Sequence, residues 1–278
     1  MLACVMMVVL SHVDASAQGQ IITRREKIKD FTTKITKVVI PDDITGEALK
    51  EGVMSAWTVS PYEFCSQAEF EAFKGDANYY FLLLVKGQNR KESEPGIKML
   101  TIVKGGAGAD KGINDMLEVV SFPLCSADLP SGRELVMIPA ILKIMQNHAA
   151  SLTDSELKAY MGLKISPKAI KELSKKKVYI SEEDLAPQVT NIDRDKLCED
   201  LMIVPEDEAD SVFNELTYNA VVGYVVAPND PVKGSSCYKM IFTADTHEIL
   251  YYKKHNITAR NGKGFLPSDL AFINGIVK

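Results

Sequence analysis

The stretch from Asn219 to Thr258 constrains the fold more than any other part of the chain. It contains three apolar runs rich in β-branched and aromatic residues, and turn residues separate these runs. The runs are Ala220 to Ala227, Tyr238 to Ala244 and Ile249 to Tyr252. This pattern predicts a three-stranded antiparallel meander.

A second meander pattern lies earlier in the chain, in the runs Tyr79 to Val85, Ile97 to Val103 and Met116 to Phe122. The segments around both meanders predict the same order of elements, β-α-β-α-β-β-β-α. We therefore expect an α/β (α+β) protein with two tandem homologous lobes, each a mostly antiparallel sheet with helices packed on one side.

Short segments of similar sequence predict which residues of the two units correspond. Lys177 to Ile180 resembles Lys37 to Ile40, and Lys239 to Ile241 resembles Lys98 to Leu100. We also expect a helix capped by Ser60, because proline follows it and a glutamate comes three residues later.

The expected domains are 1–17 as a signal peptide, 18–150 as the first α/β repeat, 151–175 as a helical connector and 176–278 as the second repeat.

The first residues have the pattern of an export signal. Leu2 to Val13 is mostly apolar, and Ala15-Ser16-Ala17 offers small residues for cleavage before Gln18. The basic residues that usually open such a signal are missing, and a buried N-terminal helix or strand is the alternative. We expect an exported, periplasmic or extracellular protein with no transmembrane segment in the mature chain.

Charge and cysteine usage narrow the function classes. The 32 lysines and arginines are outnumbered by 37 acids, for a net charge of −5, which does not favour nucleic-acid binding. Four cysteines are widely spaced in the sequence, namely Cys65, Cys125, Cys198 and Cys237. The sequence does not decide whether two of them form a disulfide, and a structural zinc site is not expected. No metal or cofactor is predicted.

Other motifs give weak signals for chemistry. The glycine-rich segment Lys104 to Gly112 lacks the pattern of a phosphate-binding loop and predicts a flexible hairpin insertion. The acids at Asp42-Asp43, Glu182 to Asp184 and Glu206 to Glu208 could form carboxylate pairs, but each lies near an expected helix start. No catalytic residue is assigned.

Aromatic and histidine side chains supply the candidate binding residues, which are Trp57, Tyr80, Tyr251, His247 and His255. Outward-facing rings could form a platform for a carbohydrate or peptide, although ordinary sheet packing also explains them. The two histidines lie in or after one hairpin, which would allow them to share a face in a metal or acid–base site. Surface positions at strand ends are the commoner explanation.

The run from Tyr238 to Leu250 (YKMIFTADTHEIL), together with the strand order of each unit, resembles the anticodon-binding-like α/β domain. That domain occurs in the amino-terminal part of the TolB protein and in the CsgG secretion lipoprotein. The resemblance implies an envelope-associated scaffold without catalysis, and no functional residue carries over.

The leading hypothesis is therefore an exported, non-enzymatic binding or scaffold protein of the cell envelope. Its partner would be an unknown protein or a peptidic or saccharide envelope ligand. The alternative is a secreted hydrolase with a site at the interlobe cleft.

Overall fold

The computed structural model describes residues 28–88, 92–154 and 166–278. The predicted signal peptide and part of the predicted connector lie outside these residues. The first lobe contains β1 (Ile35–Val39), α2 (Ile44–Ala56), β2 (Tyr62–Cys65), α3 (Gln67–Phe73), β3 (Tyr79–Gly87), β4 (Ile97–Lys104), η1 (Ile113–Asp115), β5 (Leu117–Ser126) and α4 (Arg133–Asp154). The second part contains α6 (Pro167–Leu173), β6 (Lys177–Ser181), η2 (Glu182–Asp184), α7 (Asn191–Arg194), β7 (Leu201–Val204), α8 (Glu206–Asn214), β8 (Ala220–Val226), β9 (Ser236–Thr243), β10 (Ile249–Asn256) and α9 (Pro267–Val277).

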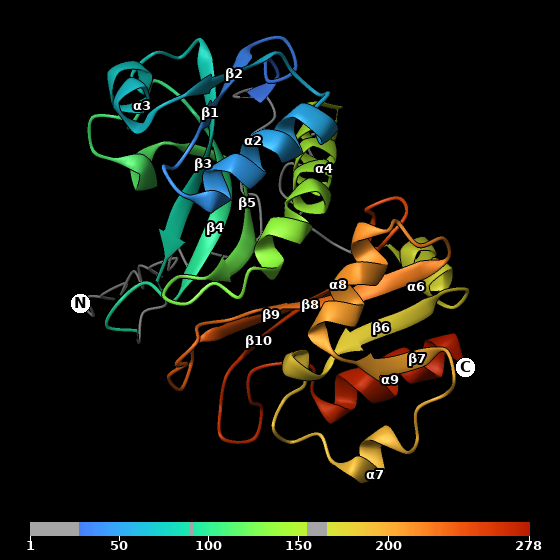
Figure 1. Cartoon of the computed structure of the whole chain (residues 1–278). Coiled ribbons are helices and arrows are strands. Elements are labelled where there is room, and N and C mark those ends of the chain that lie inside the picture. The colour runs from blue at the N-terminus through green and yellow to red at the C-terminus, as the bar shows by residue number, and fades with distance from the viewer. Residues whose placement is uncertain (1–27, 89–91, 155–165) are drawn as a thin grey trace, which may run out of the picture.

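Both lobes contain a five-stranded sheet with the same connectivity, which confirms the predicted two-lobe α/β fold (Figure 1). The orders are β2-β1-β3-β4-β5 in the first sheet and β10-β9-β8-β6-β7 in the second. Strands β3 to β5 and β8 to β10 form the predicted antiparallel meanders. The other two pairings in each sheet are parallel, because a helix connects their strands and returns the chain to the same end.

A β-bulge at the same place in each meander shows how the two units correspond. The register of β4 and β5 shifts between the pairs Ile102↔Val120 and Val103↔Glu118. The register of β9 and β10 shifts between the pairs Ile241↔Tyr251 and Phe242↔Ile249. This feature aligns Val103 with Phe242. Lys239 then corresponds to Leu100 rather than to Lys98, so the expected residue matches were wrong by two positions.

The helices lie on both faces of each sheet, not on one side as expected. Neighbouring residues of β3 point to opposite faces: Phe81 packs with Phe70 of α3, whereas Leu82 belongs to the same cluster as Leu49 of α2. Helix α4 shares the face of α2 (Figure 1). In the second lobe, α8 covers one face while α6 and α9 cover the other.

One hydrophobic core continues from the first lobe into the second. Leu82 and Phe122 of the first sheet belong to the same cluster as Val222 and Met240 of the second, and residues of α4 complete it. The rings of Phe122 and Tyr252 meet at a centroid distance of 6.0 Å. The two lobes therefore behave as one packed body.

The helix predicted to start at Ser60 starts later. Tyr62–Cys65 is the edge strand β2, and Ser66 caps α3 in a capping box with Glu69. Ser60 is buried and accepts a hydrogen bond of 3.1 Å from Nε1 of Trp57. Pairing with β1 therefore takes priority over the capping signal at Ser60.

Within the described residues, Cys65, Cys125, Cys198 and Cys237 are free thiols. Burial raises the pKa of the Cys65 and Cys237 thiols to about 11 and that of Cys125 to about 12. These three thiols are therefore poor nucleophiles at neutral pH.

Helix α4 is long and apolar enough, by length and composition alone, to cross a membrane, and among the described residues it is the one helix that is. More than half of its apolar window, 56%, is buried inside the protein. Helix α4 is thus a core helix that the two lobes share.

Candidate binding site at the junction of the lobes

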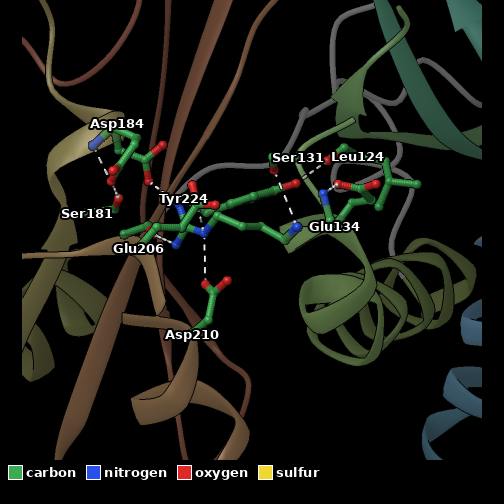
Figure 2. Close-up of polar contacts among 12 residues, drawn as sticks. Leu124, Ser131, Glu134, Ser181, Asp184, Glu206, Asp210 and Tyr224 are labelled. Carbon is green, nitrogen blue, oxygen red and sulfur yellow. Dashed lines mark hydrogen bonds and ion pairs between the residues drawn. The ribbon is translucent and has the colours of Figure 1, made fainter. Parts of the chain in front are cut away.

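A buried arginine ties the lobes together where helix α4 begins. Arg133 is 3% exposed, and its Nη1 donates to Oδ2 of Asp184 at 2.6 Å. Its Nε donates to Oδ1 of Asp210 at 2.8 Å, and its Nη2 donates to the carbonyl oxygen of Gly223 at 3.2 Å. The three acceptors belong to the second lobe, and Figure 2 shows Asp184 and Asp210 approaching the junction from different elements.

The acids outnumber the cation at this cluster. Glu206 Oε2 lies 3.9 Å from Nε of Arg133, so one guanidinium faces Asp184, Asp210 and Glu206. Burial raises the pKa of Asp184 to about 6, against the opposing attraction of Arg133. Burial also raises the pKa of Glu206. Because the guanidinium is already bonded to protein acceptors, we assign this cluster a structural role.

The hydroxyl of Tyr224 adds a second link between the lobes. It donates to the carbonyl oxygen of Leu124 on β5, and both residues are labelled in Figure 2. The guanidinium of Arg133 lies 5.4 Å from the centre of the Tyr224 ring. A buried cation over an aromatic face is stabilising, so the ring supports the arginine from one side.

A pocket of about 380 Å³ lies elsewhere on this junction, which we call the junction pocket. Helix α4, the α6 segment and the turn that leads into β10 all contribute to its wall. The lining residues are Ile144, Asn147, His148, Ser166, Lys168, Ala169, Glu172, His247, Glu248, Ile249 and Leu250. The pocket therefore combines apolar side chains with two histidines, two glutamates and a lysine.

His247 has an unusual backbone and an unpaired ring nitrogen. Its φ of 53° is in the left-handed region. Its ring stacks on Phe213 of α8, with centroids 4.9 Å apart and an interplanar angle of 13°. The buried Nε2 atom has no hydrogen-bond partner in the described part of the structure. Burial lowers the pKa of His247, and Lys143 lowers it further, so the ring is neutral at neutral pH.

The turn that carries His247 is held by α4. Nζ of Lys143 donates to the carbonyl oxygen of Thr246 at 2.7 Å. Within the turn, the backbone N–H of Glu248 donates to Oγ1 of Thr243 at 2.8 Å. These bonds fix the second lobe's side of the junction pocket against the first lobe.

The structure brings only one of the five predicted binding residues into this pocket, His247. Trp57 and Tyr80 are buried in the first lobe, where both contact the ring of Phe31, so they form no exposed platform. The Tyr80 hydroxyl donates to Asp30. Tyr80 is inside because helices and loops cover both faces of the sheet.

Neither Tyr251 nor His255 lines the junction pocket. The Tyr251 hydroxyl donates to Oδ1 of the buried Asp269 at 3.0 Å. Nε2 of His255 lies 2.8 Å from the carbonyl oxygen of Gly262. At ~3.3 Å per strand residue, β10 alone separates Ile249 from His255 by about 20 Å, so His247 and His255 do not share a site.

The remaining sequence candidates have structural roles. Asp43 caps α2 by accepting from the N–H of Gly46, and Glu206 to Glu208 form the first turn of α8, as expected. Residues 105–112 are a folded connection, in which Ala109 is buried against the core of the first sheet. No group of three or more histidine, cysteine, aspartate or glutamate side chains within the described ranges is placed to hold a metal ion.

The sequence interpretation missed His148 and Glu172 as pocket residues, and it missed Arg133. Arg133 opens an otherwise apolar segment, which was the available signal. Its partners are 51 and 77 positions away in sequence, so no local pattern reveals them.

No protein-family model, no curated protein and no solved structure matches the chain. The resemblance to the anticodon-binding-like domain therefore stays a prediction.

Proposed function

We propose that this chain is an exported, non-enzymatic binding protein that holds a peptidic or saccharide envelope ligand in the junction pocket. The observation that carries the proposal is that both lobes build this pocket. Ile144 and His148 come from α4, whereas His247 to Leu250 come from the second lobe. Ligand sites occur preferentially at such junctions.

The pocket is preformed, which favours binding. The continuous core and the Lys143 bond hold the walls formed by α4 and by the turn of His247 in place. A preformed site loses less entropy when its ligand binds. The volume of about 380 Å³ lies at the lower end of the range for small-molecule sites, so we expect the pocket to take one or two sugar or peptide units.

The chemistry of the wall suits a ligand with both polar and apolar parts. Ile144, Ile249 and Leu250 offer apolar surface, while Lys168 and Glu172 offer charges of opposite sign. Sugars and short peptides present the same mixture of hydroxyl or amide groups and apolar faces. The wall of a site for such a ligand does not need a large exposed charge of one sign.

A secreted hydrolase is the second candidate, because His148, His247, Glu172 and Glu248 line the same pocket. Histidine and carboxylate pairs act as general acids and bases. The hydrolase hypothesis has less support, because His247 stacks on Phe213 and its Nε2 is buried.

The test of the binding proposal blocks the pocket at an exposed position. Asn147 is exposed on α4 and lines the pocket, so Asn147→Trp places an indole in its mouth. Glu51→Trp, at an exposed position of α2 outside the pocket, is the matched control. We expect a panel of peptidoglycan fragments, oligosaccharides and short peptides to contain a ligand of the unmodified protein, measured by calorimetry. Asn147→Trp should weaken its affinity at least tenfold, and Glu51→Trp should not.

If Asn147→Trp binds the ligand with the same affinity as the unmodified protein, the junction pocket is not the binding site. Turnover of ester, glycoside or peptide substrates that is lost in both His148→Gln and Glu172→Gln would instead support the hydrolase.

A further inference from the structure

A second pocket, which we call the β10 pocket, lies beside the outer strand of the second sheet. Its volume is about 300 Å³ and its wall is mostly apolar. Residues of α6, β10 and α9 line it: Ile170, Leu250, Tyr251, Tyr252, Lys253 and Phe272. Phe272 is 48% exposed, and its ring lies 6.2 Å from that of Tyr251. The pocket thus has aromatic walls, one cation and an opening to solvent.

A buried ion cluster lies next to this wall. Lys239 and Asp269 are both fully buried and form an ion pair. Asp269 Oδ2 also accepts from the backbone N–H of Leu266 at 2.9 Å. Asp269 Oδ1 accepts from Nζ of Lys253 at 2.6 Å and from the Tyr251 hydroxyl. The carboxylate therefore has four donors and no free capacity to neutralise a further cation.

The cluster carries one excess positive charge. Two ammonium groups, those of Lys239 and Lys253, share the single carboxylate of Asp269. In the described part of the chain, no other acid forms an ion pair with either lysine. Lys239 is fully buried, and an uncompensated charge is unfavourable in such surroundings. An added anion would balance the cluster.

Lys253 is the group that can receive this anion. Its side chain is 48% exposed and belongs to the wall of the β10 pocket. An ammonium group has three N–H donors, and Asp269 takes one of them. The other two donors remain for a ligand at the pocket opening.

We propose that the β10 pocket binds a small carboxylate with an apolar body, such as a medium-chain fatty acid or an aromatic acid. The carboxylate pairs with Lys253, and the apolar body contacts Ile170, Tyr251 and Phe272. This proposal does not depend on the function assigned to the junction pocket, because the two pockets share only Leu250.

The experiment compares three probes of equal chain length, octanoate, 1-octanol and octylamine, by calorimetry on the full mature protein. We expect octanoate to bind at least tenfold more tightly than 1-octanol and octylamine to bind most weakly. Lys253→Met should remove the preference for octanoate while 1-octanol binds as before. The variant should fold, because removing Lys253 leaves the neutral Lys239–Asp269 pair.

Lys254→Met is the matched control. Lys254 is the next residue of β10, and its Nζ lies over the ring of Tyr238 on the other face of the sheet. This variant should keep the preference for octanoate. Equal affinities for octanoate and 1-octanol in the unmodified protein, or a preference that survives in Lys253→Met, would overturn the proposal.

A second variant tests the site without changing its charge. Phe272→Trp places a fluorescent ring in the pocket wall and keeps Lys253. Saturable quenching by octanoate, at concentrations at least tenfold below those needed for 1-octanol, supports the site. Quenching that shows no such difference, or no saturation, argues against it.

Discussion

The guanidinium of Arg133, in the first turn of helix α4, donates to the carboxylate of Asp184 at 2.6 Å across the boundary between the lobes. Both side chains are almost completely buried. A buried ion pair of this kind adds little net stability, but removing one partner leaves a buried charge without compensation. The pair therefore makes the fold of each lobe depend on the other.

Replacing Arg133 should destabilise the whole protein. We expect Arg133→Met to lower the free energy of unfolding by about 3–5 kcal/mol, because Asp184 is left buried and unpaired. Urea unfolding followed by circular dichroism measures the change.

Arg194→Met is the control, because it also removes an ion pair but at an exposed position. Arg194 pairs with Glu182 at 3.2 Å, and both side chains are exposed. Exposed pairs contribute about 0–1 kcal/mol, so this variant should unfold nearly like the unmodified protein. A loss in Arg133→Met no larger than that in Arg194→Met would contradict the role of the cluster.

The contribution of Asp184 to the free energy of unfolding should increase as the pH falls, which is the opposite of the usual behaviour of an aspartate. Its pKa is raised from 3.8 to about 6 in the folded protein. The folded state then binds the proton more tightly than the unfolded chain does, so this group's contribution to stability increases as pH falls from about 6 towards 4.

Asp184→Asn removes that titration. The difference in unfolding free energy between Asp184→Asn and the unmodified protein should change by up to about 3 kcal/mol between pH 7 and pH 4. Asp110→Asn, at an exposed position, should show no comparable trend. A pH-independent difference for Asp184→Asn would show that the pKa of Asp184 is the same in the folded and unfolded states.

The topology was predictable from the sequence, whereas the register between the lobes was not. The apolar runs predict the strands because alternation along a strand follows the burial of its faces. A shift of two residues keeps every side chain on the same face. The match of Lys239 with Lys98 therefore looked as good as the correct one with Leu100, and only the bulge distinguishes them.

The candidate site was less predictable, for two physical reasons. Alternation suggested that one of Tyr79 and Tyr80 faces outward, but both faces of the sheet are covered and Tyr80 is buried. The junction pocket depends on which helix of one lobe contacts which turn of the other. Of its residues, His247 was identified from its place in the hairpin, whereas His148 was not, because only the tertiary arrangement brings it there.

The left-handed backbone of His247 predicts an order among substitutions at that position. Asparagine tolerates a φ of 53°, whereas a β-branched residue does not. His247→Asn should cost about 0.5–1.5 kcal/mol through the lost stacking on Phe213. His247→Val should cost about 1–2 kcal/mol more because of backbone strain. Equal unfolding free energies for the two variants would contradict the conformation of this turn.

His247 should also destabilise the fold in acid. Burial lowers its pKa below the ordinary value of 6.5. Its contribution to stability is therefore present above pH 6.5 and is lost as pH falls through the lower folded value. His247→Asn should lose less stability than the unmodified protein between pH 7 and pH 5, measured by urea unfolding at each pH. An identical pH dependence in both proteins would show that the ring titrates normally.

The last prediction concerns the buried pair of Lys239 on β9 and Asp269 in the first turn of α9. Asp269→Asn leaves the fully buried Lys239 without a counter-charge, so we expect a loss of about 3–5 kcal/mol in unfolding free energy. Replacing both residues, Lys239→Met with Asp269→Asn, removes the buried charge that the single Asp269→Asn variant leaves without compensation, so the double variant should recover part of that loss. Chemical unfolding of the two single variants and the double variant gives the coupling energy directly. Strictly additive losses would mean that the two charges do not stabilise each other. Lys239 would then have to reach water by a local opening of α9, which hydrogen exchange at Leu270 and Ile273 would detect.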